Sequence, residues 1–422
     1  MATTVLRTRR GHGYAAAVVG LSFLLLATLG SPESTPSASG LAKTAPKAQS
    51  SLAALAAPTA APTRGKTPAV LDVLPANLAG KVPLDAQVTV TAKTGTLRTV
   101  SLLDAKGNEI AGEAGSASAW RSTDLLRPST AYTLRISAIG PDGMVTSTRS
   151  RFTTLKPGIE ATYHLTPAEG VVGVGMPAII QFDTPVTTAA RRAEVEKRVK
   201  VTSVPAQPGS WGWLDDRQLM YRPRTYWKPG TKVTVSTTLH GVQTGPGKWV
   251  VQDNGARFTI GPSMISTVNM KTHTLTLRRN GKTIRTFPVS TGRPGPKTET
   301  RSGIKLVMER ASLVVMDSTS LGIPKGSPGY YRIPTNWNLR VTWTGEYIHS
   351  APWSVGAQGN SNVSHGCTNM SPTAAKYMYD VSKVGDVVYF TGSSRKFEPT
   401  EGIGVWVYSY AGWKARSALA GT

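Results

Sequence analysis

The residue types best suited to chemistry lie in one short segment, residues 361–372, which reads SNVSHGCTNMSP. It contains Cys367, the single cysteine of the 422-residue chain, with His365 two positions before it. A thiol attacks a carbonyl carbon as its thiolate, and a nearby imidazole lowers the cost of forming that thiolate. Gly366 lets the backbone approach a substrate closely and leaves N–H groups free to hold an oxyanion. The segment is therefore a candidate nucleophile loop.

Three other interpretations of these residues remain open at this point. Cys367 could be a small buried apolar residue, as free cysteines commonly are. A second histidine, His349, occurs in YIHSAPW, and with His365 and Cys367 it supplies ligand types that suit zinc. His365 could also be a structural residue that bonds to the backbone. Local chemistry favours catalysis over a structural role, and zinc binding least.

The start of the chain has the order of an export signal. Arg7, Arg9 and Arg10 precede the apolar run at 14–30, YAAAVVGLSFLLLATLG. This run is short for a membrane span, which needs about 20 residues, although it could act as an uncleaved anchor. We expect residues 1–30 to be an export signal or membrane anchor. Exported chains usually use cysteines in disulfide pairs, so the lone thiol is an inert residue, an intermolecular link or a reactive group.

The charge of the chain favours anionic partners. The sequence has 48 Lys plus Arg against 24 Asp plus Glu, a formal net charge of +24. Such a field attracts nucleic acid, anionic lipid or an acidic cell-wall polymer. The sequence contains no phosphate-binding loop, zinc-finger spacing or RNA-binding signature, so we do not expect nucleic acid as a partner.

The segments before the candidate loop predict a spacer and two similar domains. Residues 31–66 are rich in Ala, Pro and Ser and predict an extended linker. Residues 67–155 and 156–261 both alternate polar and apolar residues between Gly and Pro turns, and both end on Arg-Phe-Thr. This pattern predicts two immunoglobulin-like β-sandwiches. The second also contains one helical patch, at 187–200.

Five aromatic residues cluster in the second of these domains. They could stack on sugar rings, but large aromatics more often fill a sandwich core, which is the interpretation we favour. The cluster comprises Trp211, Trp213, Tyr221, Tyr226 and Trp227.

Residues 262–393 predict the domain that carries the candidate nucleophile. A hairpin at 273–292 turns at Asn-Gly, the preferred type I′ pair. The Gly/Pro-rich passage 316–345 predicts a long loop or lid. A short helix at 373–384 and a strand at 385–392 follow the nucleophile loop. We expect the Trp-rich extension, 394–422, to pack on this catalytic domain.

The local motifs resemble those of L,D-transpeptidases, the cysteine enzymes that cross-link peptidoglycan. SHGCTN, at 364–369, is similar to the active-site signature of that family. Four other segments are similar to its mycobacterial and actinobacterial branch, and the resemblance covers about residues 264–415: VVMDSTSLGIP, SPGYYR, HSAPWSVGAQG and GIGVWVYSYAGWKA. The resemblance implies a mainly all-β fold, with two immunoglobulin-like sandwiches before a catalytic β-sandwich that has a short helix and a lid.

The resemblance also implies roles for individual residues. Cys367 is the nucleophile, and His349 is the base or the imidazolium partner of the thiolate. Ser350 orients His349 through its backbone carbonyl. The backbone N–H groups of His365, Gly366 and Cys367, with the Tyr331 hydroxyl, stabilise the oxyanion, so that His365 is more structural than catalytic. Further implied positions line the pocket or hold the loop or substrate: Met316, Trp353, Ser364 and Asn369.

The implied reaction releases D-Ala from a tetrapeptide stem, leaves a thioester on Cys367 and joins two third-position residues of neighbouring stems. Donor and acceptor stems are then the partners, and carbapenem β-lactams are expected covalent inhibitors. No metal or organic cofactor is implied. The location is outside the cytoplasm, in the wall or on the outer face of the membrane. The alternatives are a cysteine hydrolase or carboxypeptidase of wall peptides, or a non-catalytic wall-binding protein.

Two positions depart from the family pattern. Thr368 occurs where an aliphatic residue is common, and ETRSG at 299–303 replaces a common Thr-Pro-x-Gly. We expect neither to touch the reacting groups.

Overall fold

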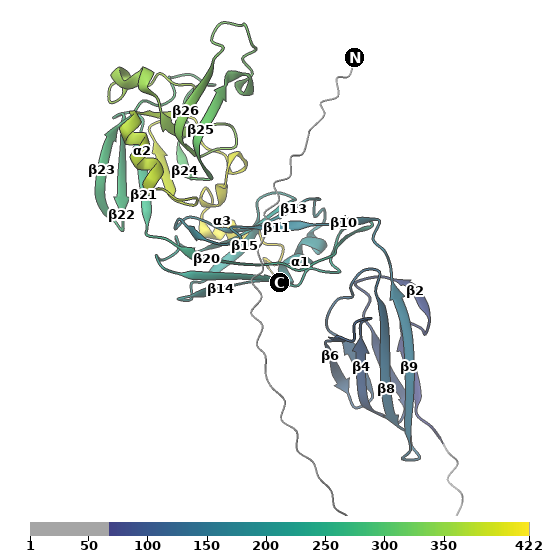
Figure 1. Cartoon of the computed structure of the whole chain (residues 1–422). Coiled ribbons are helices and arrows are strands. Elements are labelled where there is room, and N and C mark those ends of the chain that lie inside the picture. Colours follow the sequence, from purple (N-terminus) through teal and green to yellow (C-terminus); the bar gives the residue numbers. More distant parts are fainter. Residues whose placement is uncertain (1–66, 422) are drawn as a thin grey trace, which may run out of the picture. The chain divides into compact units, whose positions relative to one another are not determined.

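The computed structural model describes residues 67–421 (Figure 1). The export segment and linker predicted at 1–30 and 31–66 lie outside the described residues. Within 67–421, no helix combines the length and apolar character needed to span a membrane.

The first sandwich has two sheets, with strand orders β1-β3-β7-β6 and β2-β9-β8-β4-β5. A single apolar core includes Val90 from the first sheet and Leu134 and Phe152 from the second, so the sheets pack face to face. Residues along β8 alternate between buried and more exposed, as period-two patterning predicts. The strands are β1 (Val70–Leu74), β2 (Ala79–Val82), β3 (Thr89–Thr94), β4 (Thr96–Leu103), β5 (Glu109–Ile110), β6 (Gly112–Ser116), β7 (Ala119–Ser122), β8 (Ala131–Ile139) and β9 (Val145–Thr154).

The second sandwich has sheets ordered β11-β13-β16-β15 and β12-β20-β17-β14, beside a small sheet β10-β19-β18. Its helix α1 (Ala189–Lys197) begins where the Thr188 hydroxyl accepts from the Arg191 N–H, within the helical patch predicted at 187–200. The strands are β10 (Ile159–Ala161), β11 (Tyr163–Thr166), β12 (Val171–Val172), β13 (Ala178–Phe182), β14 (Val199–Val204), β15 (Gly209–Trp213), β16 (Gln218–Pro223), β17 (Lys232–Thr237), β18 (Gln243–Gly245), β19 (Lys248–Val250) and β20 (Gly255–Ile260).

The catalytic region contains two further sheets, ordered β23-β22-β21-β29-β24 and β25-β26-β27-β28. One core holds Val268 of the first sheet, Ile348 of the second and Met378 of helix α2 (Pro372–Val381), so these elements share a single interior. The strands are β21 (Met264–Asn269), β22 (Thr274–Arg279), β23 (Lys282–Pro288), β24 (Gly303–Leu306), β25 (Glu309–Asp317), β26 (Arg332–Arg340), β27 (Tyr347–Ser350), β28 (Thr368–Met370) and β29 (Val387–Thr391).

Local signals in this region correspond to real elements. Asn280 and Gly281 have φ of 49° and 82°, which matches the type I′ turn expected between β22 and β23. Helix α2 begins at Pro372, where the Ser371 hydroxyl accepts from the Ala374 N–H. The predicted helix at 373–384 and strand at 385–392 overlap α2 and β29.

The passage 316–345 is more regular than its composition suggests. Strands β25 and β26 form a long antiparallel hairpin that pairs Glu309 with Arg340 at one end and Asp317 with Arg332 at the other. Gly and Pro concentrate in the tip, residues 318–331, which starts with the 3₁₀ helix η1 (Ser318–Leu321). The expectation of a long structureless loop is therefore wrong for residues 316–317 and 332–340, because these strand residues on either side of the tip pair with each other, whereas residues 322–331 form an irregular loop.

The C-terminal extension contacts more than the catalytic domain on which we expected it to pack. Its first part does contact that domain, since Glu401 pairs with Arg301 at 2.7 Å. Its last part contacts the second sandwich: Trp406 Nε1 donates to the Gly175 carbonyl at 2.7 Å, and Trp413 Nε1 donates to Ser210 at 3.1 Å. The extension contains η3 (Pro399–Glu401), η4 (Gly404–Trp406) and α3 (Tyr410–Lys414).

The aromatic cluster of the second sandwich serves packing. Trp213 and Trp227 are buried, and Trp211, Tyr221 and Tyr226 pack against the same cores. Gly212 permits this arrangement, because a Cβ there would lie 2.7 Å from the ring of Trp413.

We expect Trp413→Ala to lower the free energy of unfolding by about 3–5 kcal/mol, the range for deleting a buried large aromatic. The side chain is 0% exposed and joins the C-terminal extension to the second sandwich. Denaturant unfolding of the full chain measures the change. The matched control is Trp343→Ala, at a 48% exposed residue, which should shift stability by at most about 0.5 kcal/mol. Equal shifts for the two variants would contradict this packing role.

Candidate active site

Two neighbouring strands bring the candidate base and nucleophile together. Strands β27 and β28 pair in parallel, with His349 opposite Asn369 and Ile348 opposite Thr368. Cys367 immediately precedes β28, and His349 belongs to β27. Both residues line one cavity of about 770 Å³. The pairing thus juxtaposes residues 18 positions apart in the sequence, as the resemblance requires.

The nucleophile loop is held by its own polar groups. The Ser364 hydroxyl donates to the Cys367 carbonyl at 2.7 Å and accepts from the Gly366 N–H at 3.1 Å. Gly366 has φ of +133°, a region that disfavours residues with a Cβ, although the nearest atom to such a Cβ would be 3.6 Å away. The backbone conformation, not lack of space, requires glycine here.

The hydrogen bonds within the loop leave only some of the expected oxyanion donors unpaired. The Gly366 N–H already donates within the loop, to Ser364. The N–H groups of His365 and Cys367 have no hydrogen-bond partner among residues 67–421. Of the three backbone N–H groups expected to hold an oxyanion, these two are therefore the ones left unpaired within the described residues.

The sulfur of Cys367 contacts two backbone groups of the strand beside it. Its Sγ donates to the Gly345 carbonyl at 3.6 Å, and the Tyr347 N–H donates to the sulfur. Cys367 keeps part of its surface open to the cavity, but the surrounding protein removes much of the water that would solvate a thiolate. This burial raises the pKa of the Cys367 thiol to about 12. The resting group is a thiol that needs a base.

His349 has the protonation state of a base. It is buried, and its Nδ1 lies 2.9 Å from the Ser350 carbonyl oxygen. That carbonyl can only accept, so Nδ1 carries the proton and Nε2 keeps its lone pair. Burial lowers the pKa of His349 to about 4, so the ring is neutral at pH 7.

The hydrogen bonding of His365 differs from that of His349. Its Nε2 lies 3.0 Å from Nη2 of Arg293, and because a guanidinium only donates, this nitrogen accepts. Burial, and next the charge of Arg293, lower the pKa of His365. The ring also lies 5.2 Å from that of Tyr331, centroid to centroid. These contacts hold His365 in the cavity wall and leave its Nε2 occupied as a hydrogen-bond acceptor.

The other predicted residues lie around the same cavity. Burial raises the pKa of Tyr331 to about 12, so its hydroxyl stays protonated and able to donate. The ring of Trp353, 54% exposed, lies 6.1 Å from that of His349. Asn369 pairs with Ser290 through both backbone groups and donates from Nδ2 to Ser354 at 3.0 Å. Six predicted residues besides His349 and Cys367 line the cavity: Met316, Tyr331, Trp353, Ser364, His365 and Asn369.

The zinc alternative finds no support in the geometry. Within residues 67–421, no three His, Cys, Asp or Glu side chains lie close enough together to hold a metal ion.

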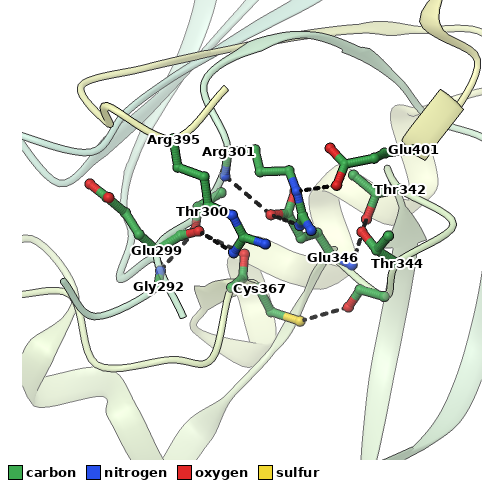
Figure 2. A network of polar contacts seen from close by, with 12 residues as sticks. Gly292, Glu299, Thr300, Arg301, Thr342, Thr344, Glu346, Cys367, Arg395 and Glu401 are labelled. Carbon is green, nitrogen blue, oxygen red and sulfur yellow. Dashed lines mark hydrogen bonds and ion pairs between the residues drawn. The ribbon is translucent and has the colours of Figure 1, made fainter. Parts of the chain in front are cut away.

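Sequence reasoning missed a polar network behind the nucleophile loop (Figure 2). The Thr300 hydroxyl donates to the Gly366 carbonyl at 2.8 Å, and Arg301 and Lys305 both contact the buried carboxylate of Glu346. Segment 299–303 supports the loop from behind, since Thr300 bonds to the backbone carbonyl of Gly366, the residue before Cys367. The sequence feature that could have revealed this network was charge. Arg301 and Lys305 lie on either side of the start of β24, and Glu346 lies immediately before YIHS.

Comparison with known proteins agrees with this fold and shows the family. Residues 79–243 match the bacterial Ig domain family, and 263–390 match the L,D-transpeptidase catalytic domain. L,D-transpeptidase 2 of Mycobacterium tuberculosis is 37% identical over 342 residues, which cover 80% of this chain and 82% of that protein. L,D-transpeptidase 5 of the same species is 34% identical over 354 residues, covering 82% and 76%.

Solved structures are similar over a shorter length. An LD transpeptidase in complex with imipenem is 36% identical, with a TM-score of 0.47, and covers 56% of this chain and 100% of that one. L,D-transpeptidase 3 of Mycobacterium tuberculosis with a faropenem-derived adduct is 31% identical, with a TM-score of 0.46 and coverage of 56% and 99%.

The chain belongs to the L,D-transpeptidase family and is an enzyme of that class. The mainly β fold, with immunoglobulin-like sandwiches before the catalytic domain, is confirmed as predicted.

Proposed function

We propose that this enzyme cross-links peptidoglycan through a thioester on Cys367. The donor is a tetrapeptide stem, and the bond broken joins its third-position diamino acid to the terminal D-Ala. The observation that carries the proposal is the pairing of β27 with β28, which places a neutral, buried His349 and the single thiol of the chain on one cavity.

The first half-reaction forms the thioester. Nε2 of His349 accepts the thiol proton as Sγ attacks the carbonyl carbon. The negative charge that develops on the carbonyl oxygen is stabilised by the N–H groups of His365 and Cys367 and by the Tyr331 hydroxyl. The tetrahedral intermediate collapses, the proton on His349 passes to the leaving nitrogen, and D-Ala departs.

The second half-reaction uses an amine from a neighbouring stem. The amine attacks the thioester carbonyl, His349 removes a proton from the attacking nitrogen, and the sulfur leaves and is reprotonated. The product is an amide between two third-position residues. Met316 of β25 and Tyr331 of the hairpin tip line the cavity, and in this proposal their side chains limit the access of water that would hydrolyse the thioester.

The proposed reaction also predicts a class of inhibitor and the location of the enzyme. A carbapenem presents a strained carbonyl to the same thiol and oxyanion donors, so it should acylate Cys367 covalently. Peptidoglycan lies outside the cytoplasm, so we place the enzyme in the cell wall or on the outer face of the cytoplasmic membrane, with the sandwiches as spacers.

Intact-protein mass spectrometry tests the proposal. Incubation of the full chain with a purified tetrapeptide stem should add the mass of the stem minus D-Ala, and supplying a second stem should yield cross-linked dimer. A carbapenem should add its full mass. Release of a tripeptide with no dimer would instead support a hydrolase. Absence of any adduct with either compound would support a wall-binding protein.

A further inference from the structure

Four charged side chains form a largely buried cluster behind the nucleophile loop: Arg301, Lys305, Glu346 and Glu401. Figure 2 labels three of them, Arg301, Glu346 and Glu401. Lys305, on β24, is 0% exposed, and its Nζ contacts Oε2 of Glu346. Arg301 bridges the two acids, with Nη1 2.9 Å from Glu346 and Nε 2.7 Å from Glu401. Phe390 places its ring centroid 4.0 Å from the Lys305 ammonium, so the surroundings are partly apolar.

Stability alone is a weak explanation for this cluster. Removing charges from water is costly, and replacing buried ion pairs by apolar residues of similar volume is often neutral or stabilising. None of the four side chains takes part in the proposed chemical steps. Their position relative to the sulfur points to another role.

Glu346 lies between the two backbone groups that contact the sulfur of Cys367. The Gly345 carbonyl before it accepts from Sγ, and the Tyr347 N–H after it donates to the sulfur. The main chain of Glu346 is held as well, since its N–H donates to the Thr342 hydroxyl at 2.9 Å. Anchoring the Glu346 side chain therefore fixes both of these backbone groups.

The cluster is also connected to the backbone of Gly366, the residue before Cys367, through Thr300. Thr300 donates to the Gly366 carbonyl at 2.8 Å and accepts from the Gly292 N–H at 2.8 Å. The next residue, Arg301, donates its backbone N–H to Oε1 of Glu346 at 3.1 Å. Through Glu346, the segment that holds Gly366 is joined to the segment that holds the sulfur.

We propose that Glu346, anchored by Lys305 and Arg301, is a positioning residue that holds Cys367 between these two segments and balances the charge behind its sulfur. This inference rests on the proposed role of Cys367 as the nucleophile. Glu346, which together with Arg301 also lines the cavity, acts in this proposal through the backbone and through its field.

The two sides of the ion pair act on the thiol in opposite directions. The Glu346 carboxylate raises the pKa of Cys367, whereas the Lys305 ammonium lowers it. The other ionisable groups near the sulfur or on the cavity wall are the phenols of Tyr331 and Tyr347, the His349 and His365 imidazoles, and side chains of Lys297, Asp317, Arg340 and Arg395. All of these remain unchanged in the variants below.

Alkylation provides a direct readout, because Cys367 is the single thiol of the chain. Iodoacetamide reacts with the thiolate, so the rate at fixed pH follows the thiolate fraction. We expect Glu346→Gln to speed alkylation at pH 8 by about tenfold, because it removes the charge that raises the pKa of Cys367, and Lys305→Met to slow it by about tenfold, because it removes the charge that lowers that pKa. Acylation by a carbapenem should slow in both variants, because both loosen the backbone groups around the sulfur.

Controls separate this role from general damage to the fold. Lys376→Met removes an exposed lysine that pairs with Asp380 on α2, and it should change neither rate. Circular dichroism melting of the full chain monitors folding. If Glu346→Gln does not fold, Glu401→Gln weakens the cluster from its partly exposed edge, and it should change both rates in the same directions by smaller factors.

Alkylation rates that move in the same direction in the two main variants, or that do not move, would overturn the inference, as would unchanged acylation. The outcome for the proposed function is separate. If the wild-type chain forms no adduct with a stem or a carbapenem, the proposed function fails, whereas the alkylation rates still test the influence of the cluster on the thiol.

Discussion

Replacing Cys367 with alanine should abolish acylation and cross-linking, lowering the rate by about 10⁶-fold, as loss of a nucleophile does in other acyl-transfer enzymes. No other thiol exists in the chain to replace it. The fold should survive, because the side chain is only partly buried and its one sulfur donor contact is long, at 3.6 Å. The expected cost in unfolding free energy is about 1 kcal/mol.

Two measurements check this result together. Intact mass spectra should show no adduct of the variant with a tetrapeptide stem or a carbapenem, while its thermal transition stays near that of the wild type. The matched control is Ser361→Ala, an exposed position in the same loop, which should keep full acylation. Dimer formed by a folded Cys367→Ala chain would refute the thioester mechanism.

Replacing His349 with alanine should slow acylation by about 10²–10⁴-fold, the usual contribution of a general base. His365→Ala should cost much less, because the Nε2 of His365 is engaged by Arg293 and its role is to support the cavity wall. Single-turnover acylation by a carbapenem, with both variants matched for stability, gives the ranking. The reverse order would reassign the base to His365.

The pH dependence of acylation provides a second test of His349. Only the neutral ring can accept the thiol proton, so the wild-type rate should fall as pH drops through about 4, the lowered pKa of His349. This fall in rate at acidic pH should disappear in His349→Ala. If the wild-type rate instead fell near pH 6.5, the ordinary pKa of histidine, the base would be more solvated than the burial of His349 implies.

Local interactions explain why several elements could be predicted from the sequence. The turn at Asn280 and Gly281 depends only on two residues that accept positive φ. Helix α2 starts at a serine cap followed by proline, and both signals act within one helical turn. Alternating polarity along β8 likewise predicted a half-buried strand. For the turn and the helix start, the energy that decides the structure comes from neighbours in the chain, whereas the alternation along β8 only indicates which side chains the sandwich core will bury.

The hairpin of β25 and β26 shows where such local reasoning fails. The Gly and Pro residues between 318 and 331 suggested an irregular loop, but strand pairing across that tip continues to Asp317 and Arg332. Backbone pairing over such a distance compensates for weak local signals, and composition does not record it. The C-terminal extension is similar, because its contacts with the second sandwich join residues about 200 positions apart.

For the site, the sequence by itself indicated the candidate nucleophile, its short glycine-containing loop and, through the family resemblance, the candidate base. Only the tertiary structure decided what surrounds them. It placed Glu346 and Lys305, 41 positions apart, in one buried pair and directed Thr300 to the carbonyl of Gly366, 66 positions away. It also assigned the Gly366 N–H to Ser364 and the His365 ring to Arg293. The physical reason is that burial and opposite charge act between side chains that the fold brings together, and these determine the pKa of the Cys367 thiol.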